Sequence, residues 1–254
     1  MAIGIAAIAT VPATARAAGE GEVTARYRVA YGALPVGHLD AAIALGAGGD
    51  YAIEATFGTG GLVRLIRQTE GRVGATGALA GAPVPGAFDL AYSYGDRDRA
   101  RSIRFDGGAV GAVEIVPPPR ADDERTEPTA AELAGAIDPA SALIVPAAPD
   151  EDPCRRTLRV FDGRTLVELA LAPSRTKPYR ADGWSGEVTV CDIAAKPIAG
   201  ARRSTREEIE AVRGAEVALA PVPGRDAWIA VELRVPSSAG MVSARAVKLR
   251  FAGD

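Results

Sequence analysis

The sequence has little of the material from which catalytic and metal sites are built. Its 254 residues contain one histidine and two cysteines. Any Ser–His or Cys–His pair for nucleophilic catalysis must therefore use His38, and no residue near it in sequence is suited to orient it. His38 and two thiols are too few for a zinc site, and their spacing matches no zinc pattern. The sequence predicts no catalytic residue, no metal and no cofactor.

The chain also lacks a strong charge of either sign and a long apolar run. It has 29 basic and 32 acidic residues, a net charge of -3, so no large positive field attracts nucleic acid. No segment reaches the roughly 18 uninterrupted apolar residues that a membrane helix needs. We expect a mature protein with no nucleic-acid partner and no transmembrane segment.

Asparagine is absent and only 5% of the residues are aromatic. The core must therefore consist mainly of Val, Leu, Ile and Ala, and Asp-Gly and Gly-Gly replace Asn-Gly as markers of tight hairpins. With 29 glycines and 18 prolines, the chain favours many short elements over long helices.

The N-terminus has the pattern of a secretory signal. Residues Ala2–Val11 are apolar, and Pro12 then precedes Ala13–Ala17, where small residues are spaced as a signal peptidase requires. We predict cleavage after Ala17, with Ala15 as the second choice, and export to the periplasm. The usual basic residues before the apolar stretch are missing, so a late start codon and a buried strand remain the alternatives. Residues 1–17 are thus assigned to the signal and 18–254 to a single β-rich domain.

Cys154 and Cys191 are consistent with export to the periplasm. Two cysteines in an exported chain most simply form a disulfide, because the compartment is oxidising. The alternative is a pair of buried, unpaired thiols.

Alternating polar and apolar residues recur along most of the chain and predict half-buried strands of an antiparallel sheet. Glycine-containing turns separate these segments at short intervals, which favours a meander of hairpins over βαβ units. The segment Leu62–Gln68 fits both a strand and one turn of helix. The clearest alternating segments are 23–31, 51–57, 103–105, 229–235 and 247–251.

One break interrupts the meander. Residues 117–128 are rich in proline and acidic residues and predict an exposed loop. Two short helices are expected after it. Thr129 and Glu132 form a capping box for the first, and Asp138-Pro139 caps the second over Ala140–Val145.

A third short helix is expected over Ser204–Arg213, with Thr205 and Glu208 as its capping box. This segment is heavily charged, so we expect it to lie on the surface.

The sequence contains only incomplete versions of known catalytic motifs. Gly183–Gly186 has the start of a nucleophile elbow, but Glu187 stands where its second glycine is required. The glycine-rich stretches 46–49 and 58–61 do not fit a phosphate loop, so we interpret them as hairpin turns. The sequence favours a protein that is not an enzyme, with an unrecognised hydrolase as the remaining alternative.

Five segments of the chain, in this order, carry a family resemblance: Tyr27–Gly37, Pro85–Phe88, Ile137–Leu143, Cys154 with Val160–Arg164, and Cys191 with Pro197–Gly200. Together they resemble an exported bacterial family known only as domain of unknown function 3108. The resemblance covers roughly residues 21–252 and has no activity or catalytic residue to transfer.

The resemblance implies a mainly β fold, a single curved antiparallel sheet that forms a partly open barrel or spiral roll. Loosely, such a roll is similar to the half-barrel of periplasmic lipoprotein carriers, which hold acyl chains on the concave face. By this analogy the protein binds an apolar or lipid-like ligand, with Tyr27, Tyr31, Tyr51 and Phe57 as candidate concave-face residues. Each of the four is as readily an ordinary core residue. The alternative function is an envelope-maintenance or scaffold protein that acts through contacts with other envelope proteins.

Overall fold

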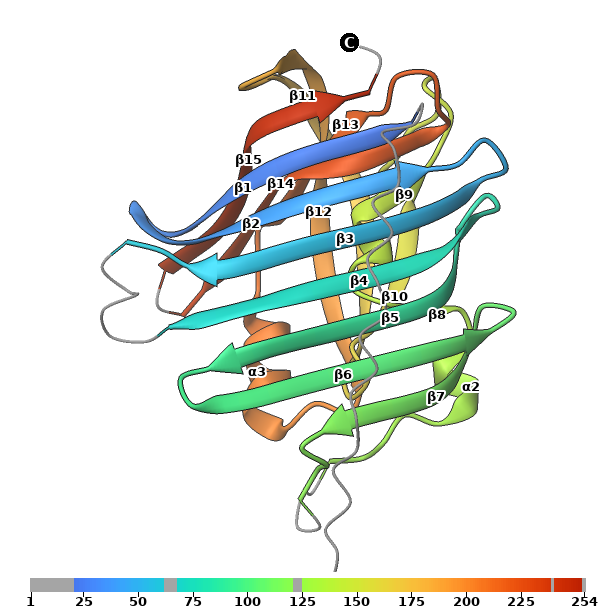
Figure 1. The fold of residues 1–254 in the computed structure, drawn as a ribbon, viewed down its shortest axis with the longest axis vertical. Helices are drawn as coiled ribbons and strands as arrows, with labels where there is room; N and C mark the ends of the chain where they lie inside the picture. Colours follow the sequence, from blue (N-terminus) through green and yellow to red (C-terminus); the bar gives the residue numbers. More distant parts are fainter. Residues whose placement is uncertain (1–20, 62–67, 121–124, 239, 253–254) are drawn as a thin grey trace, which may run out of the picture.

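The computed structural model describes residues 21–61, 68–120, 125–238 and 240–252, which form one curved sheet (Figure 1). The predicted signal peptide and most of the ambiguous segment Leu62–Gln68 lie outside these residues. The fold is mainly β, as the alternation predicts. The first half of the sheet is a meander of seven antiparallel strands: β1 (Glu22–Tyr31), β2 (Leu34–Leu45), β3 (Asp50–Thr59), β4 (Thr69–Leu79), β5 (Pro83–Tyr94), β6 (Arg97–Asp106) and β7 (Ala109–Val116).

The register of the meander explains how the alternating residues make a core. Directly paired residues on neighbouring strands point to the same face. Ile43 pairs with Ile53, Ile53 with Ala75, Ala75 with Phe88, and Phe88 with Ile103. All five are buried and belong to one cluster, so this row forms an apolar belt on the inner face of the meander.

The second half of the chain continues the sheet and curls behind the first. In Figure 1, β12 runs nearly vertically behind strands β1–β7, which run closer to the horizontal. The two layers therefore cross, and the main core lies between them. The strands of this half are β10 (Arg156–Phe161), β11 (Leu166–Ala181), β12 (Trp184–Ala199), β13 (Ala215–Pro221), β14 (Ala227–Ser237) and β15 (Gly240–Phe251).

Two contacts bring this sheet close to a closed barrel. At the tip of the long β11–β12 hairpin, the Asp182 N–H donates to Val247 O and Asp182 O accepts from the Leu249 N–H, both at 2.9 Å. The two ends of the sheet meet through side chains, because Arg101 on β6 forms an ion pair of 2.5 Å with Asp162 in the β10–β11 turn.

The interior of the roll is filled by the chain's own segment 136–147. This segment contains the two-residue strand β8 (Ala136–Ile137), the 3-10 turn η1 (Ser141–Leu143) and the strand β9 (Ile144–Pro146). β8 pairs with β10, whereas β9 pairs with β14. Ala136, Ala140 and Ile144 are buried in the same cluster as the apolar belt. The concave face is therefore packed against protein along this segment.

The helices follow the predictions in part. α2 (Ala130–Leu133) has the predicted capping box between Thr129 and Glu132. The second predicted helix is only the turn η1, because Ile144–Pro146 leaves the helical path to pair with β14. The predicted cap is also wrong, because the N-cap of η1 is Ala140, which makes no side-chain cap bond. Asp138 lies two residues earlier, and its Oδ1 accepts from the Ala140 and Ser141 N–H groups at 2.9 Å.

The capping box of the third helix is wrong. α3 (Arg203–Ala211) begins one residue before the predicted start and has Arg202 at its N-cap with no side-chain bond. Arg206 reaches back to the Pro197 and Ile198 carbonyls, at 3.2 and 3.3 Å, which ties the first turn of α3 to the end of β12. This tertiary contact fixes the start of α3 at Arg203. Thr205 therefore lies inside the helix and cannot serve as its N-cap.

Cys154 and Cys191 are joined by a disulfide with a Cα–Cα distance of 5.3 Å, as the sequence predicts. Both cysteines are fully buried in a second cluster with Val145, Leu219 and Trp228. The bond fastens the segment between β9 and β10 to the middle of β12.

The described part of the predicted 117–128 loop is mostly exposed, and Thr126 O accepts from the Gly200 N–H at 2.8 Å. Neither helix among the described residues has the length and apolar character needed to span a bilayer.

Candidate functional site: a pocket at the mouth of the roll

One end of the roll, which we call the mouth, is formed by four chain connections. These are the β2–β3, β4–β5 and β13–β14 turns and the segment between β9 and β10. Between them lies a pocket of about 530 Å³. Its lining residues are Leu45, Gly46, Ala47, Gly49, Asp50, Leu79, Gly81, Pro146, Ala147, Ala148, Glu151, Gly224, Arg225, Asp226 and Ala227.

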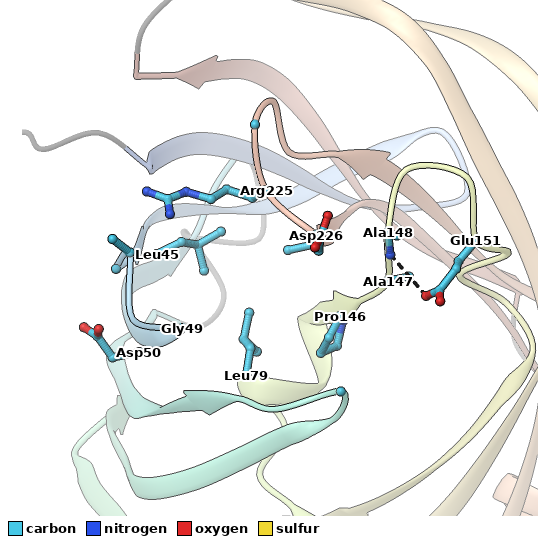
Figure 2. A pocket seen from close by; sticks show the side chains of 15 residues that line it. Leu45, Gly49, Asp50, Leu79, Pro146, Ala147, Ala148, Glu151, Arg225 and Asp226 are labelled. Carbon is cyan, nitrogen blue, oxygen red and sulfur yellow. Dashed lines mark hydrogen bonds between the residues drawn. The ribbon is translucent and has the colours of Figure 1, made fainter.

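The floor of the pocket is apolar. Leu45 ends β2 and is only 4% exposed, and Ala147 and Ala227 are buried beside it in the lining. Leu79 and Pro146 also line the pocket, and both are labelled in Figure 2. Aliphatic side chains of this kind accept hydrocarbon and offer it no hydrogen-bonding group.

The rim of the pocket is charged and more acidic than basic. It carries the carboxylates of Asp50, Glu151 and Asp226 against the guanidinium of Arg225. Glu151 Oε2 accepts from the Ala148 N–H at 3.1 Å, which holds this carboxylate over the loop that follows β9 (Figure 2). An anionic group at the rim would meet more like charge than opposite charge.

Backbone hydrogen bonds hold the pocket walls in place. The Leu79 N–H donates to Gly49 O at 2.7 Å and joins the β2–β3 turn to β4. The Ala147 N–H donates to Asp226 O at 3.1 Å and joins the loop after β9 to the β13–β14 turn. Gly49 has a φ of +87°, and a Cβ there would lie 3.0 Å from Leu79 O, so glycine is required for this close approach.

The four tyrosine and phenylalanine residues predicted for the concave face do not line this pocket. Tyr51 is 3% exposed and its hydroxyl lies 2.5 Å from Ser141 Oγ. Tyr27 donates to Ala230 O at 2.7 Å. Tyr31 and Phe57 are half-buried on β1 and β3. Tyr51 is thus engaged with the interior segment 136–147, and a ligand could reach it only by displacing that segment.

Ser141 links Tyr51 to a buried carboxylate. Ser141 Oγ donates to Asp138 Oδ2, and both residues are fully buried. Burial raises the pKa of the Tyr51 hydroxyl to about 12 and also raises the pKa of Asp138 above its ordinary value. A serine and a carboxylate in contact are also found in hydrolases, but here no histidine is near them and solvent cannot reach them. The group is a structural network.

His38, the one histidine of the sequence, is exposed on β2 and pairs with Arg28 and Gly58 across the sheet. In the part of the chain that the structure describes, no group of three or more His, Cys, Asp or Glu side chains could hold a metal ion.

The pocket residues were missed by sequence reasoning because each connection has the signature of an ordinary turn. Glycines 46, 49, 81 and 224 mark these turns, but nothing in the sequence indicates that the four turns meet.

The strands of the sheet pair antiparallel except β8 and β10, which pair in parallel. A nearly closed β-roll of this kind, with a pocket at one end and an interior filled by its own chain, defines the class of this protein: a barrel-like β protein. The family model described as "Protein of unknown function (DUF3108)" matches residues 26–209, and the chain belongs to this family.

Among solved structures, the chain is similar to a β-barrel-like protein of the domain of unknown function DUF1849 from Brucella abortus. The TM-score is 0.52 at 10% sequence identity, and the alignment covers 91% of this chain and 98% of the other. At this identity the likeness shows the fold alone. No curated protein matches the sequence.

Proposed function

We propose that the protein is an exported, non-enzymatic binding protein that takes an apolar or lipid-like ligand at the mouth of its roll. The observation that carries this proposal is the pocket of about 530 Å³ with its apolar floor. This volume falls within the range of about 300–1,000 Å³ that is usual for small-molecule sites. The disulfide, which oxidising compartments favour, supports export to the periplasm.

The charges of the rim indicate the kind of ligand. The hydrocarbon part of the ligand lies on Leu45, Leu79 and Pro146, and its polar end meets the rim. Because acidic groups outnumber Arg225 there, a neutral or cationic head group is favoured over an anionic one. Long-chain alcohols and amines should therefore bind more tightly than a carboxylate of the same chain length.

The pocket can be tested with the variant Leu79→Asp. Placing a carboxylate on the floor should weaken binding of a long-chain alcohol by about tenfold or more, because hydrocarbon burial against one leucine contributes about 1.5–3 kcal/mol. Binding is measured by isothermal titration calorimetry, and native mass spectrometry of the purified protein shows whether a lipid is carried from the cell.

The matched control is Val116→Asp, which introduces the same charge on β7 at a side chain that is 47% exposed and does not line the pocket. This control should bind the alcohol as the parent protein does. The proposal is wrong if Leu79→Asp and the parent protein bind the long-chain alcohol, amine and carboxylate with equal affinity. It is also wrong if neither protein binds any of these three ligands.

A further inference from the structure

Three arginines surround one serine on the face of the sheet near the β14–β15 turn, away from the mouth. Strands β14, β15 and β1 are neighbours there (Figure 1). Ser243 on β15 pairs directly with Arg234 on β14, and Arg245 follows two residues later on β15. Arg28 on β1 pairs with Arg245 and is therefore diagonal to Ser243. Directly paired residues share a face, as do residues two apart in a strand, so all four side chains point to the same side. We call these four residues the arginine cluster.

The spacing of the strands lets the three arginines reach one ligand group. In an antiparallel sheet, the Cβ atoms of directly paired residues lie about 4.5–5.5 Å apart, and diagonal neighbours lie about 7–8 Å apart. Residues two apart in one strand are separated by about 7 Å. Arginine side chains can span these distances, so all three guanidinium groups can meet an oxyanion that sits over the Ser243 hydroxyl.

The Arg28 guanidinium is available for such a ligand. Its side chain is exposed, and among the residues that the structure describes it has no hydrogen-bond or ion-pair partner. Asp40 on β2 is its diagonal neighbour, but this carboxylate is already held by Arg26, whose Nε donates to Asp40 Oδ1 at 2.6 Å. Arg28 therefore contributes a full positive charge to the surface.

Arg234 is only weakly engaged. It lies 3.8 Å from Glu216, but Arg175 already donates to both oxygens of that carboxylate, at 2.8 and 3.0 Å. Asp192 pairs with Glu216 and shares its face, but it lies on β12, three strands from Ser243. The hydrogen-bonding groups of Arg234 thus remain largely open to a ligand.

Arg245 is a fixed positive charge beside these two arginines. Its guanidinium carbon lies 4.0 Å from the centre of the Tyr179 ring, and the group donates to Glu232 Oε2 at 3.1 Å and to Arg180 O at 3.3 Å. Glu232 does not fully neutralise it, because Lys177 contacts the same carboxylate oxygen at 2.6 Å. Each carboxylate next to the arginine cluster is thus shared with a further cation, and positive charge is in excess.

We propose that the arginine cluster is a binding site for a phosphate group. Guanidinium groups donate charge-assisted hydrogen bonds to phosphate oxygens, often in pairs, and the Ser243 hydroxyl can donate a further one. Arg28 and Arg245 lie directly opposite each other, and such like charges destabilise a sheet. A bound phosphate dianion offsets this repulsion. The group that the cluster recognises is the phosphate itself, either free or as part of a lipid head group.

The test is isothermal titration calorimetry of the full chain at low ionic strength, with inorganic phosphate and with glycerol 3-phosphate, the head group of phosphatidic acid. We expect the parent protein to bind at least one of them, and salt to weaken the binding. Tighter binding of glycerol 3-phosphate would indicate a lipid source, and tighter binding of inorganic phosphate a free one. Arg28→Gln and Arg234→Gln should each weaken the binding about tenfold or more, since each removes hydrogen bonds between charged groups.

Arg72→Gln is the matched control, because Arg72 is an exposed arginine on β4 with no side-chain partner in the described part of the chain. It should bind phosphate like the parent protein. The pocket variant Leu79→Asp should do so as well, which separates this site from the proposed ligand pocket.

Thermal unfolding gives a second measurement that a merely structural role of Arg28 would not produce. Bound phosphate should raise the Tm of the parent and of Arg72→Gln but leave that of Arg28→Gln nearly unchanged. Without phosphate, Arg28→Gln should be at least as stable as the parent, because it removes the repulsion from Arg245. The proposal is overturned if neither phosphate compound binds the parent, or if Arg28→Gln and Arg72→Gln bind phosphate alike.

Discussion

Reduction of the Cys154–Cys191 disulfide is expected to lower the free energy of unfolding by about 4 kcal/mol. The bond closes a loop with a sequence separation of 37, and constraining a loop of this length in the unfolded chain stabilises the folded state by about that amount in the chain-entropy model. Both cysteines are fully buried, so the bond also packs against the second core cluster. Urea unfolding with and without reductant measures the difference.

The double variant Cys154→Ala/Cys191→Ala provides the control. It should unfold at lower urea concentration than the oxidised parent, and reductant should have no further effect on it. The segment between β9 and β10, which the disulfide fastens to β12, includes Ala148 and Glu151 of the pocket, so the variant should also bind the long-chain alcohol less tightly. Identical unfolding curves for the oxidised and reduced parent would contradict the prediction.

Substitution of the buried carboxylate, Asp138→Ala, should destabilise the fold by about 3–5 kcal/mol. Asp138 accepts hydrogen bonds from the Ala140 and Ser141 N–H groups and from Ser141 Oγ. Alanine leaves these three donors without their acceptor inside a fully buried site, and each such group costs about 1–3 kcal/mol. Thermal or urea unfolding measures the loss.

Asp138→Asn distinguishes hydrogen bonding from charge. The amide oxygen can still accept from both N–H groups, and its NH₂ can donate to Ser141 Oγ, so most of the stability should remain. An asparagine variant as unstable as the alanine variant would mean that the carboxyl group itself is required.

The same asparagine variant gives a pH-dependent prediction. Burial raises the pKa of Asp138, so this carboxyl group stays protonated to a higher pH in the folded protein than in the unfolded chain. The stability that this contributes is fully present below the ordinary carboxyl pKa of 3.8 and is lost as the pH rises through the raised pKa. The parent should therefore lose stability relative to Asp138→Asn as the pH rises above 3.8, measured as the difference between their unfolding free energies.

Local patterns predicted local structure well. The alternation in 51–57 and 247–251 became strands β3 and β15, because burial of one face requires a period of two. Thr129 and Glu132 form their capping box, which needs only residues three apart. The box of Thr205 and Glu208 did not form, because contacts of Arg206 with the end of β12 place the helix start one residue earlier.

The candidate site could not be predicted from local sequence patterns. Tyr51 has the same alternation as any inward-facing strand residue, and only the return of segment 136–147 into the roll brings Ser141 against it. The pocket joins residues as distant as Leu45 and Ala227, each in a connection that is unremarkable by itself. Likewise, Tyr31 and Val242 become neighbours only because β1 pairs with β15.

The sequence by itself determined that this protein is a hairpin-built β protein with one disulfide, since alternation, turn residues and two cysteines act over short distances or by elimination. The tertiary structure alone decided that the roll is filled by its own chain and that its pocket opens at the mouth. The physical reason is that these features depend on how far the sheet curls before its ends meet. That curl is set by the register and packing of strands far apart in the chain, which no single segment specifies.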